Sequence, residues 1–179
     1  SIVVLDKRPK QSENFLTMKT IKKSPNMKLI FESDELKDYL KEVPPVVDFH
    51  SPLVKREIET ITSKTESPLA RAELAFEFAR DRIQHSFDAD TCEAVTINTE
   101  DVLAKREGIC FAKTHVLASF LRGMNIPTGF CYQLKKDPKA GFAMHGLNAI
   151  YLEDTGWFRV DPRGNKPGID AQFSTDEEK

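Results

Sequence analysis

The stretch REGICFAKTHVLASFLRGMNIP, residues 106–127, decides the fold of this chain. Gly108 is typical of a residue just past the end of a helix, and a second helix begins almost at once at Cys110. Apolar side chains cover most of the circumference of residues 110–124, which predicts a helix that is central to the domain. Gly123 is the expected end of that helix. The thiol of Cys110 therefore lies in the first turn of a buried helix.

That position gives Cys110 a chemical explanation as well as a structural one. The free N–H groups and the dipole at a helix N-terminus favour an anion, so they lower the pKa of a thiol. The same N–H groups can hold an oxyanion that develops on a carbonyl attacked by the sulfur. The ordinary explanation competes with this, because a lone cysteine in an apolar segment is usually a small buried hydrophobe.

Helices are predicted upstream of this stretch. Ser-Pro pairs at residues 51–52 and 67–68 each open one, because serine caps free N–H groups and proline suits the first helical turn. A shorter helix is expected from residue 98 or 99 to Gly108, with acidic residues in its first turn and basic residues in its last. Residues 27–31 are expected to form a short strand and residues 34–42 a short helix.

Strands follow the central helix. In TGFCYQLKK, residues 128–136, large apolar residues alternate with smaller or polar ones, as in a half-buried strand. HGLNAIYL (145–152) and GWFRVD (156–161) then form two strands joined by EDTG, the signature of a hairpin. Because helices dominate the first half and strands the second, we expect an α+β architecture with an antiparallel sheet.

Two residues of this hairpin are candidate partners for the thiol. His145 begins one strand and Asp161 ends the other, so they supply a base and the group that orients it. If the hairpin folds about Asp154, Asp161 lies opposite Leu147, on the same sheet face as His145 and within reach of it. A shift of one residue would place Asp161 on the opposite face. Arg159 shares the face of Asp161, and an Arg159–Asp161 pair is an alternative to the triad.

Taken singly, His145 and Asp161 also have ordinary explanations, as a satisfied histidine and a turn-opening Asp-Pro. Their appearance in the order Cys, His, Asp, each at an element boundary, favours the catalytic interpretation. Structural or surface roles are expected for the other noteworthy residues: Cys92, Cys131, His50, His115, Asn148 and Trp157.

Composition limits the classes of partner. The chain has 179 residues, 40% hydrophobic and 30% charged, which is typical of one folded domain. A net charge of −2 indicates no strongly basic face, so no nucleic-acid partner is expected. No apolar run approaches membrane-spanning length and no signal-peptide pattern begins the chain, although a signal removed before Ser1 would leave no trace. Three widely spaced cysteines without a CxxC pair favour a reducing, cytoplasmic location. A zinc site built from them and a histidine is the weakest alternative.

Four ordered motifs resemble the transglutaminase-like superfamily. They are RDRIQHSF, then VLAKREGICFAKTHVLASFLRGMNIP, then HGLNAIYL, then GWFRVDPRG. The resemblance covers roughly residues 67–170 and rests on a Gly-x-Cys helix start, a helix that ends in Arg-x-x-(Gly)-Ile-Pro, a strand that begins with His, and a Trp-x-x-x-Asp-Pro strand. It implies a papain-like fold with Cys110, His145 and Asp161 as the catalytic triad. Two positions depart from the pattern: Asn125 stands where the family often has Gly, and His85 where an aromatic residue is usual, which leaves the second oxyanion donor open.

The expected organisation is an N-terminal extension (1–50) packed on the core, a transglutaminase-like catalytic domain (51–173) and a frayed polar tail (174–179). The expected function is cysteine-dependent acyl transfer on amide bonds through a thioester, as a peptidase, amidase or transglutaminase. Its substrate would be a protein, a peptide or an amide-bearing small molecule, and the mechanism needs no cofactor and no metal. The alternative is a catalytically silent fold that serves as a protein-binding module. The oligomeric state stays open.

Overall fold

The computed structural model describes residues 2–4, 29–89, 96–137 and 141–176. The predicted helices are present as α1 (Pro52–Thr62), α2 (Pro68–Asp81), α3 (Thr99–Lys105) and α4 (Cys110–Gly123). Single 3₁₀ turns form η1 (Leu36–Leu40) and η2 (Ser86–Asp88). The Ser67 hydroxyl caps α2 by accepting from the N–H of Ala70 at 3.3 Å, whereas Ser51 makes no such bond at the start of α1.

The main sheet is antiparallel, in the strand order β5 (Thr128–Asp137), β6 (Gly141–Leu152) and β7 (Gly156–Val160). Two smaller sheets accompany it: β1 (Ile2–Val4) with β2 (Leu29–Phe31), antiparallel, and β3 (Gln84–His85) with β4 (Glu107–Gly108), parallel. The register of β6 on β7 places Asn148 opposite Val160 and Leu152 opposite Gly156, so the hairpin is centred on Asp154. The register predicted from the sequence is therefore confirmed.

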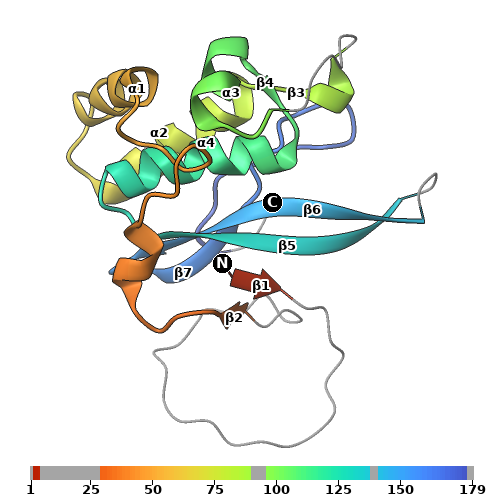
Figure 1. Cartoon of the computed structure of the whole chain (residues 1–179). Helices are drawn as coiled ribbons and strands as arrows, with labels where there is room; N and C mark the ends of the chain where they lie inside the picture. The colour runs from red at the N-terminus through yellow and green to blue at the C-terminus, as the bar shows by residue number, and fades with distance from the viewer. Residues whose placement is uncertain (1, 5–28, 90–95, 138–140, 177–179) are drawn as a thin grey trace, which may run out of the picture.

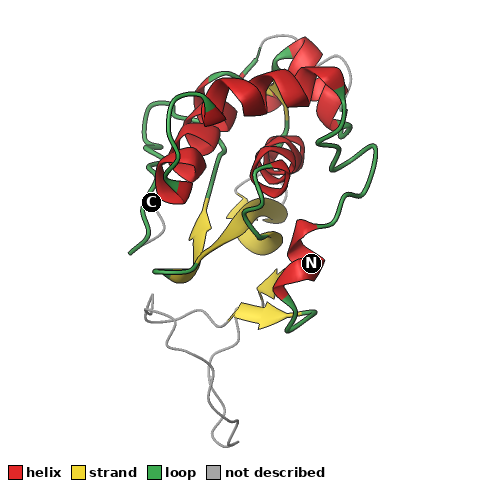
Figure 2. Ribbon diagram, turned by 90° about the vertical axis from the view of Figure 1, so that its left-hand side faces the viewer, coloured by secondary structure: helices red, strands yellow, loops and turns green. Residues whose placement is uncertain are grey.

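The elements form layers, with α4 in the middle of the molecule. Figure 1 shows the helices above one face of the three-stranded sheet and the β1–β2 pair below the other. In the orthogonal view of Figure 2 the sheet edge faces a helix seen end-on, and further helices lie beyond it. The main core joins these helices to one face of the sheet through residues such as Phe76, Phe120, Leu117 and Ile150. The α+β class predicted from the sequence is confirmed. The packing of α4 on the sheet places the N-terminus of this helix beside β6.

Two glycines have roles other than the predicted helix ends. The left-handed residue after α3 is Arg106, at φ 56°, and not Gly108. Gly108 is needed because a Cβ there would lie 2.7 Å from the Cβ of Ala112, in the first turns of α4. Gly123 is still within α4, packed against Phe49 and Ile58, and the left-handed residue that follows is Asn125, at φ 62°. Asn125 takes this conformation in place of glycine because asparagine tolerates it better than most residues.

The alternation in β5 also differs from the expectation of one buried face. Cys131 is fully buried, whereas Leu134 is 61% exposed. Both faces of the sheet are covered, because the segment around η1 forms a second cluster in which Tyr39 and Trp157 pack on Cys131, Leu147 and Ala149. Leu134 pairs with Met144, further along the β5–β6 hairpin. In Figure 1 the far end of this hairpin extends past the helices.

Strand β6 begins at Gly141, so His145 lies within the strand and not at its start, as the sequence had suggested. Strand β7 is shorter and ends at Val160, opposite Asn148. As a result, the edge of β6 before Asn148 carries no β7 partner. This open edge is where the candidate site lies.

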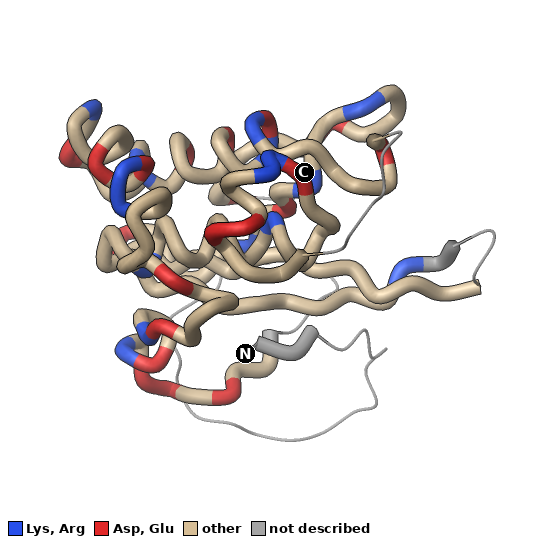
Figure 3. Tube along the Cα trace, turned by 45° about the horizontal axis from the view of Figure 1, so that its top comes forward, with Lys and Arg blue, Asp and Glu red and all other residues tan. Residues whose placement is uncertain are grey.

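Charged residues of both signs are distributed over the described surface. Figure 3 shows basic and acidic segments intermingled over the helices. Within the described ranges no helix is long and apolar enough to cross a membrane.

Candidate active site

Cys110 is the first residue of α4 and is 8% exposed. The residue before it, Ile109, has extended backbone and offers no side-chain cap to the helix. The first N–H groups of a helix have no partner within the helix, so they stay available to an anion at this end. The local sequence therefore sets the thiol where a negative charge is stabilised.

His145 and Asp161 lie in direct contact. Nε2 of His145 is 2.6 Å from Oδ2 of Asp161. The second carboxylate oxygen, Oδ1, accepts from the N–H of Arg163 at 3.1 Å, and Nζ of Lys135 is 3.6 Å from Oδ2. These contacts hold the carboxylate in place, and Arg159 is not among the groups that contact Asp161 in the described part of the chain.

The imidazole of His145 lies close enough to the thiol of Cys110 to lower the pKa of that thiol. Because Asp161 takes Nε2, Nδ1 is the ring nitrogen left for the sulfur. The imidazole thus links thiol and carboxylate, the arrangement needed for a base with a fixed orientation. The structure brings together Cys110, His145 and Asp161, the three residues singled out from the sequence.

The contacts shift the ionisation of both groups. Burial alone raises the pKa of the Cys110 thiol, but hydrogen bonds from His145, His85 and the N–H of Gly146 outweigh it and lower the pKa to about 6. Burial lowers the pKa of His145, but the hydrogen bonds with Asp161 and Cys110 raise it to about 9. Between these values the favoured state is a thiolate beside an imidazolium, and the two values belong to the pair. The pKa of Asp161 is held below its usual value by His145, against the effect of its burial.

The open edge of β6 contributes to the site. The backbone N–H of Gly146, on this edge, helps to lower the pKa of the Cys110 thiol. Gly146 also lies under the ring of Phe111, where a Cβ would be 2.9 Å from the ring. This close approach brings the first turn of α4 onto β6, so glycine at position 146 is required for contact between thiol and strand.

His85 is a second histidine at the sulfur, and the sequence analysis did not assign it a role. Its side chain also lowers the pKa of the Cys110 thiol, and it is 6% exposed. It reaches the site because β3 pairs with β4, which places His85 opposite Gly108, two residues before the thiol. The only sequence signal was its departure from the aromatic residue that is usual at this position.

Comparison with known proteins identifies the family of this chain. Residues 56–162 match the sequence profile of the transglutaminase-like superfamily, which is more than half of the chain. The chain belongs to the transglutaminase-like superfamily. No curated protein sequence matches this member of the superfamily.

Two solved structures share the fold of this transglutaminase-like chain. A candidate cysteine protease from Cytophaga hutchinsonii aligns with a TM-score of 0.57 and 12% identity, over 73% of this chain and 43% of that one. The periplasmic domain of TgpA from Pseudomonas aeruginosa aligns with a TM-score of 0.52 and 16% identity, over 71% of this chain and 46% of that one. This chain thus spans less than half the length of either protein, and at these identities the likeness shows the fold alone.

The remaining polar residues of the transglutaminase-like fold have structural contacts. Nδ2 of Asn148 donates to the carbonyl oxygens of Thr114 and Gly129, so it joins α4 to β5. Cys131 is buried in the cluster on the far face, together with Trp157. Nδ1 of His115 lies 3.0 Å from the carbonyl oxygen of Ile97, and His50 pairs with Glu42. Cys92 lies outside the described residues.

The described part of the chain also shows whether side chains could bind a metal ion together. Within those residues, no group of three or more His, Cys, Asp and Glu side chains is placed to hold a metal ion. Cys110 and Cys131 are both free thiols. The chemistry available at the site is that of a thiol, two imidazoles and a carboxylate.

Proposed function

We propose that this protein is a cysteine-dependent acyl-transfer enzyme that acts on amide bonds. The observation that carries the proposal is the linked series of contacts from the Cys110 thiol to the His145 imidazole and from Nε2 of His145 to Asp161 at 2.6 Å. A buried thiol that only packs needs none of these partners. In this proposal Cys110 is the nucleophile, His145 the acid and base, and Asp161 the orienting group.

The proposed reaction has two halves. The thiolate of Cys110 attacks the amide carbonyl carbon, a C–S bond forms, and the carbonyl π electrons move to oxygen. The intermediate collapses with cleavage of the C–N bond, and the imidazolium of His145 gives its proton to the leaving amine. Water or a primary amine then attacks the thioester and loses a proton to His145, and cleavage of the C–S bond releases the thiolate. Hydrolysis makes the protein a peptidase or amidase, and aminolysis makes it a transglutaminase.

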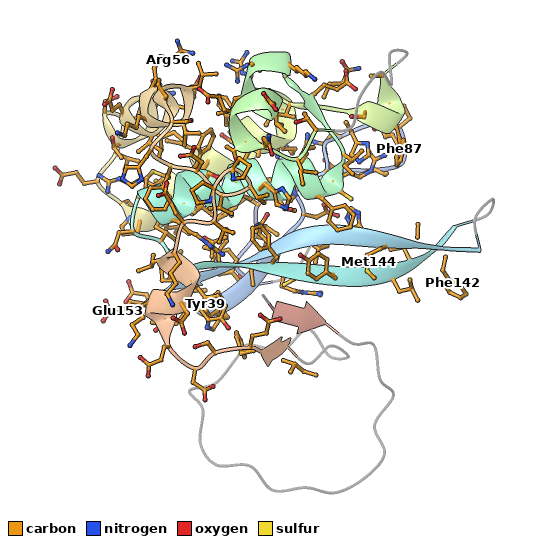
Figure 4. All side chains as sticks on the ribbon, viewed as in Figure 1. Tyr39, Arg56, Phe87, Phe142, Met144 and Glu153 are labelled. Carbon is orange, nitrogen blue, oxygen red and sulfur yellow. The ribbon has the colours of Figure 1, made fainter. Side chains whose placement is uncertain are left out.

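The surface beside the site favours a protein or peptide substrate. Leu134, Phe142 and Met144 are 61%, 63% and 55% exposed, and Phe87 is 75% exposed. In Figure 4, Phe87 lies near the α4 N-terminus, at the right of the view. Phe142 and Met144 lie below it, on the β5–β6 hairpin. By the strand register, Leu134, Phe142 and Met144 share the sheet face of Gly146, which contacts Phe111. Large exposed apolar side chains gathered beside a nucleophile favour substrates with bulky apolar residues.

We also propose a compartment, because the nucleophile is a thiol. Nucleophilic catalysis needs Cys110 in its reduced form, and the two described cysteines are free. We therefore place the reaction in a reducing compartment such as the cytoplasm.

The test uses casein as the probe, because it is unstructured and rich in apolar residues. Fluorescein-labelled casein reports hydrolysis, and incorporation of dansylcadaverine into dimethylcasein reports aminolysis. Each is measured with the wild-type chain and with Cys110→Ala, and intact-mass spectrometry follows an acyl adduct on Cys110. Turnover or an adduct that disappears in Cys110→Ala supports the proposal, and the active assay identifies the acceptor. If neither appears while the fold is intact and casein still binds, the chain is a silent binding module and the proposal fails.

A further inference from the structure

The second histidine at the sulfur is held differently from the first. His85 lies in β3, directly beside Gly108 of β4, and the N–H of Gln84 donates to the carbonyl oxygen of Arg106 at 2.8 Å. The side chain is 6% exposed. The parallel pairing of β3 with β4 therefore fixes the backbone of His85 next to the segment that precedes Cys110. As a result, the imidazole has a defined position beside the start of α4.

The hydrogen bonds of His85 fix its tautomer. Nδ1 accepts from the N–H of Phe87 at 3.3 Å, so Nδ1 carries no proton. The ring proton of the neutral imidazole must then be on Nε2. The ring also packs against Phe87, with centroids 5.5 Å apart, and Phe87 lies at the surface of η2 (Figure 4). His85 is thereby set up as a donor through Nε2–H, and its acceptor nitrogen is already occupied.

The two imidazoles around Cys110 therefore have different chemistry. His145 has a carboxylate partner, Asp161, which stabilises its protonated form. His85 has a backbone N–H in the corresponding place, so its Nδ1 is an acceptor and its ring can donate only through Nε2. Both rings lower the pKa of the Cys110 thiol. A base needs the first environment, whereas a hydrogen-bond donor that keeps its proton throughout the reaction needs the second.

We propose that His85 is a catalytic residue whose Nε2–H stabilises the oxyanion formed when Cys110 attacks a carbonyl. The inference rests on the proposed acyl-transfer function. As the C–S bond forms, negative charge passes from sulfur to the carbonyl oxygen, which is bound to the same carbon. The Nε2–H of His85 can therefore donate a hydrogen bond first to the thiolate and then to the carbonyl oxygen, and it keeps its proton in both. The uncapped N–H of Cys110 at the start of α4 is the second donor of the hole.

Two reactions of the same thiol separate this role from a role in lowering the thiol pKa. Alkylation by iodoacetamide needs the thiolate but forms no oxyanion. Acylation by p-nitrophenyl acetate needs the thiolate and forms an oxyanion on the ester carbonyl. The rates of both are measured at a pH above the thiol pKa of each variant, where ionisation is complete and only the oxyanion distinguishes them.

The matched variants are His85→Phe, which keeps a ring and loses the donor, and His85→Gln, whose Nε2 amide restores a donor. We expect His85→Phe to slow acylation on the order of 100-fold, as loss of one oxyanion donor does elsewhere. Alkylation of fully ionised Cys110 should stay within a few-fold of wild type, which also shows that the site is intact. His85→Gln should recover most of the acylation rate.

The outcomes are distinct. Equal loss in both reactions, or no loss of acylation in His85→Phe, overturns the oxyanion role while the acyl-transfer proposal stands. If wild-type Cys110 is not acylated at all, and Cys110→Ala behaves identically, the proposed function fails first. Acylation that falls alone and returns in His85→Gln supports His85 as the donor.

Discussion

Nε2 of His145 and Oδ2 of Asp161 are 2.6 Å apart, and this contact raises the pKa of His145. The carboxylate raises the pKa of His145 to about 9 against the effect of burial, and the imidazolium in turn helps to lower the pKa of Cys110. Asp161 is therefore connected to the thiol electrostatically although a ring lies between them. Its own position depends on the N–H of Arg163 and on Lys135.

Asp161→Ala should consequently lower amide turnover by roughly 10²–10⁴-fold, the range seen when the orienting acid of a triad is removed. The pKa of His145 should fall, so the high-pH limb of the turnover rate should move to lower pH. Lys135→Gln is the matched control. Lys135 lowers the pKa of His145, so its loss should move the same limb slightly upward. A limb that moves in the same direction in both variants would contradict this assignment.

The pH profiles of two reactions should differ in the wild-type chain. Iodoacetamide alkylation of Cys110 needs only the thiolate, so its rate should rise through pH 6 and stay high. Amide turnover also needs the imidazolium proton of His145, so it should rise through pH 6 and fall through pH 9.

The alkylation is followed by peptide mass spectrometry, which assigns the label to each cysteine. Fully buried Cys131 serves as an internal reference and should react far more slowly than Cys110. In His145→Ala the midpoint for Cys110 should move up toward the free-thiol value of about 8.5. Equal, slow labelling of Cys110 and Cys131 would falsify the claim of an activated thiol.

The sequence predicted the parts of this site that follow from local rules. The start of α4 at Cys110 follows from an apolar helix that begins after Gly108, and the register of Asp161 follows from the short EDTG turn. His85 could not be predicted in this way. Its contact depends on two strands of two residues each, which pair in parallel across more than twenty intervening positions and carry no periodicity.

Tertiary packing also explains the errors at glycines and in β5. Gly108 looked like a helix end, but its constraint is the approach of Ala112, which belongs to the next helix. Alternation in β5 suggested one buried face, but the segment that contains Tyr39 covers the other face. Ala112 is only four residues from Gly108 but belongs to the next helix, and Tyr39 is far from β5 in the sequence, so neither contact follows from the periodicity of a single element.

Gly108→Ala tests the close packing that positions the thiol. The added methyl would lie 2.7 Å from the Cβ of Ala112 and 3.3 Å from Cγ1 of Val102. We expect a loss of about 1–3 kcal/mol in the free energy of unfolding, as for other overpacked sites, measured by urea denaturation. Alkylation of Cys110 should slow as well, because α4 must move away from β4 and from His85.

The double variant Gly108→Ala with Ala112→Gly is the control, because it removes the clash. It should recover the alkylation rate, although glycine inside a helix costs up to about 1 kcal/mol of its own. If the double variant alkylates as slowly as the single one, steric contact with Ala112 is not the reason for glycine at position 108.

Lys113 gives a prediction about stability as a function of pH. This lysine of α4 is fully buried, and its Nζ donates to the carbonyl oxygens of Arg80, at 3.0 Å, and of Ile83. Burial lowers its pKa to about 7, while the charges of Asp81, Asp161 and Asp88 raise it and Arg163 lowers it. The pKa in the unfolded chain is 10.5.

Between pH 7 and pH 10.5 the unfolded chain therefore binds more protons at Lys113 than the folded chain does. Stability contributed by this group rises with pH across that window. Lys113→Met abolishes the titration but leaves Cys110, His145 and Asp161 in place. The difference in unfolding free energy, wild type minus Lys113→Met, should thus increase by roughly 2 kcal/mol from pH 7.5 to pH 9.5.

Urea denaturation at several pH values measures this slope, and Lys105→Met, at an exposed position near the end of α3, is the control. The absolute stability of Lys113→Met also includes the loss of hydrogen bonds to Arg80 and Ile83, but that loss is the same at every pH. Only the change with pH reports the titration. A difference that stays flat from pH 7.5 to pH 9.5 would mean that Lys113 keeps its proton in the folded chain, held by the carbonyl oxygens at the end of α2 and by the surrounding carboxylates.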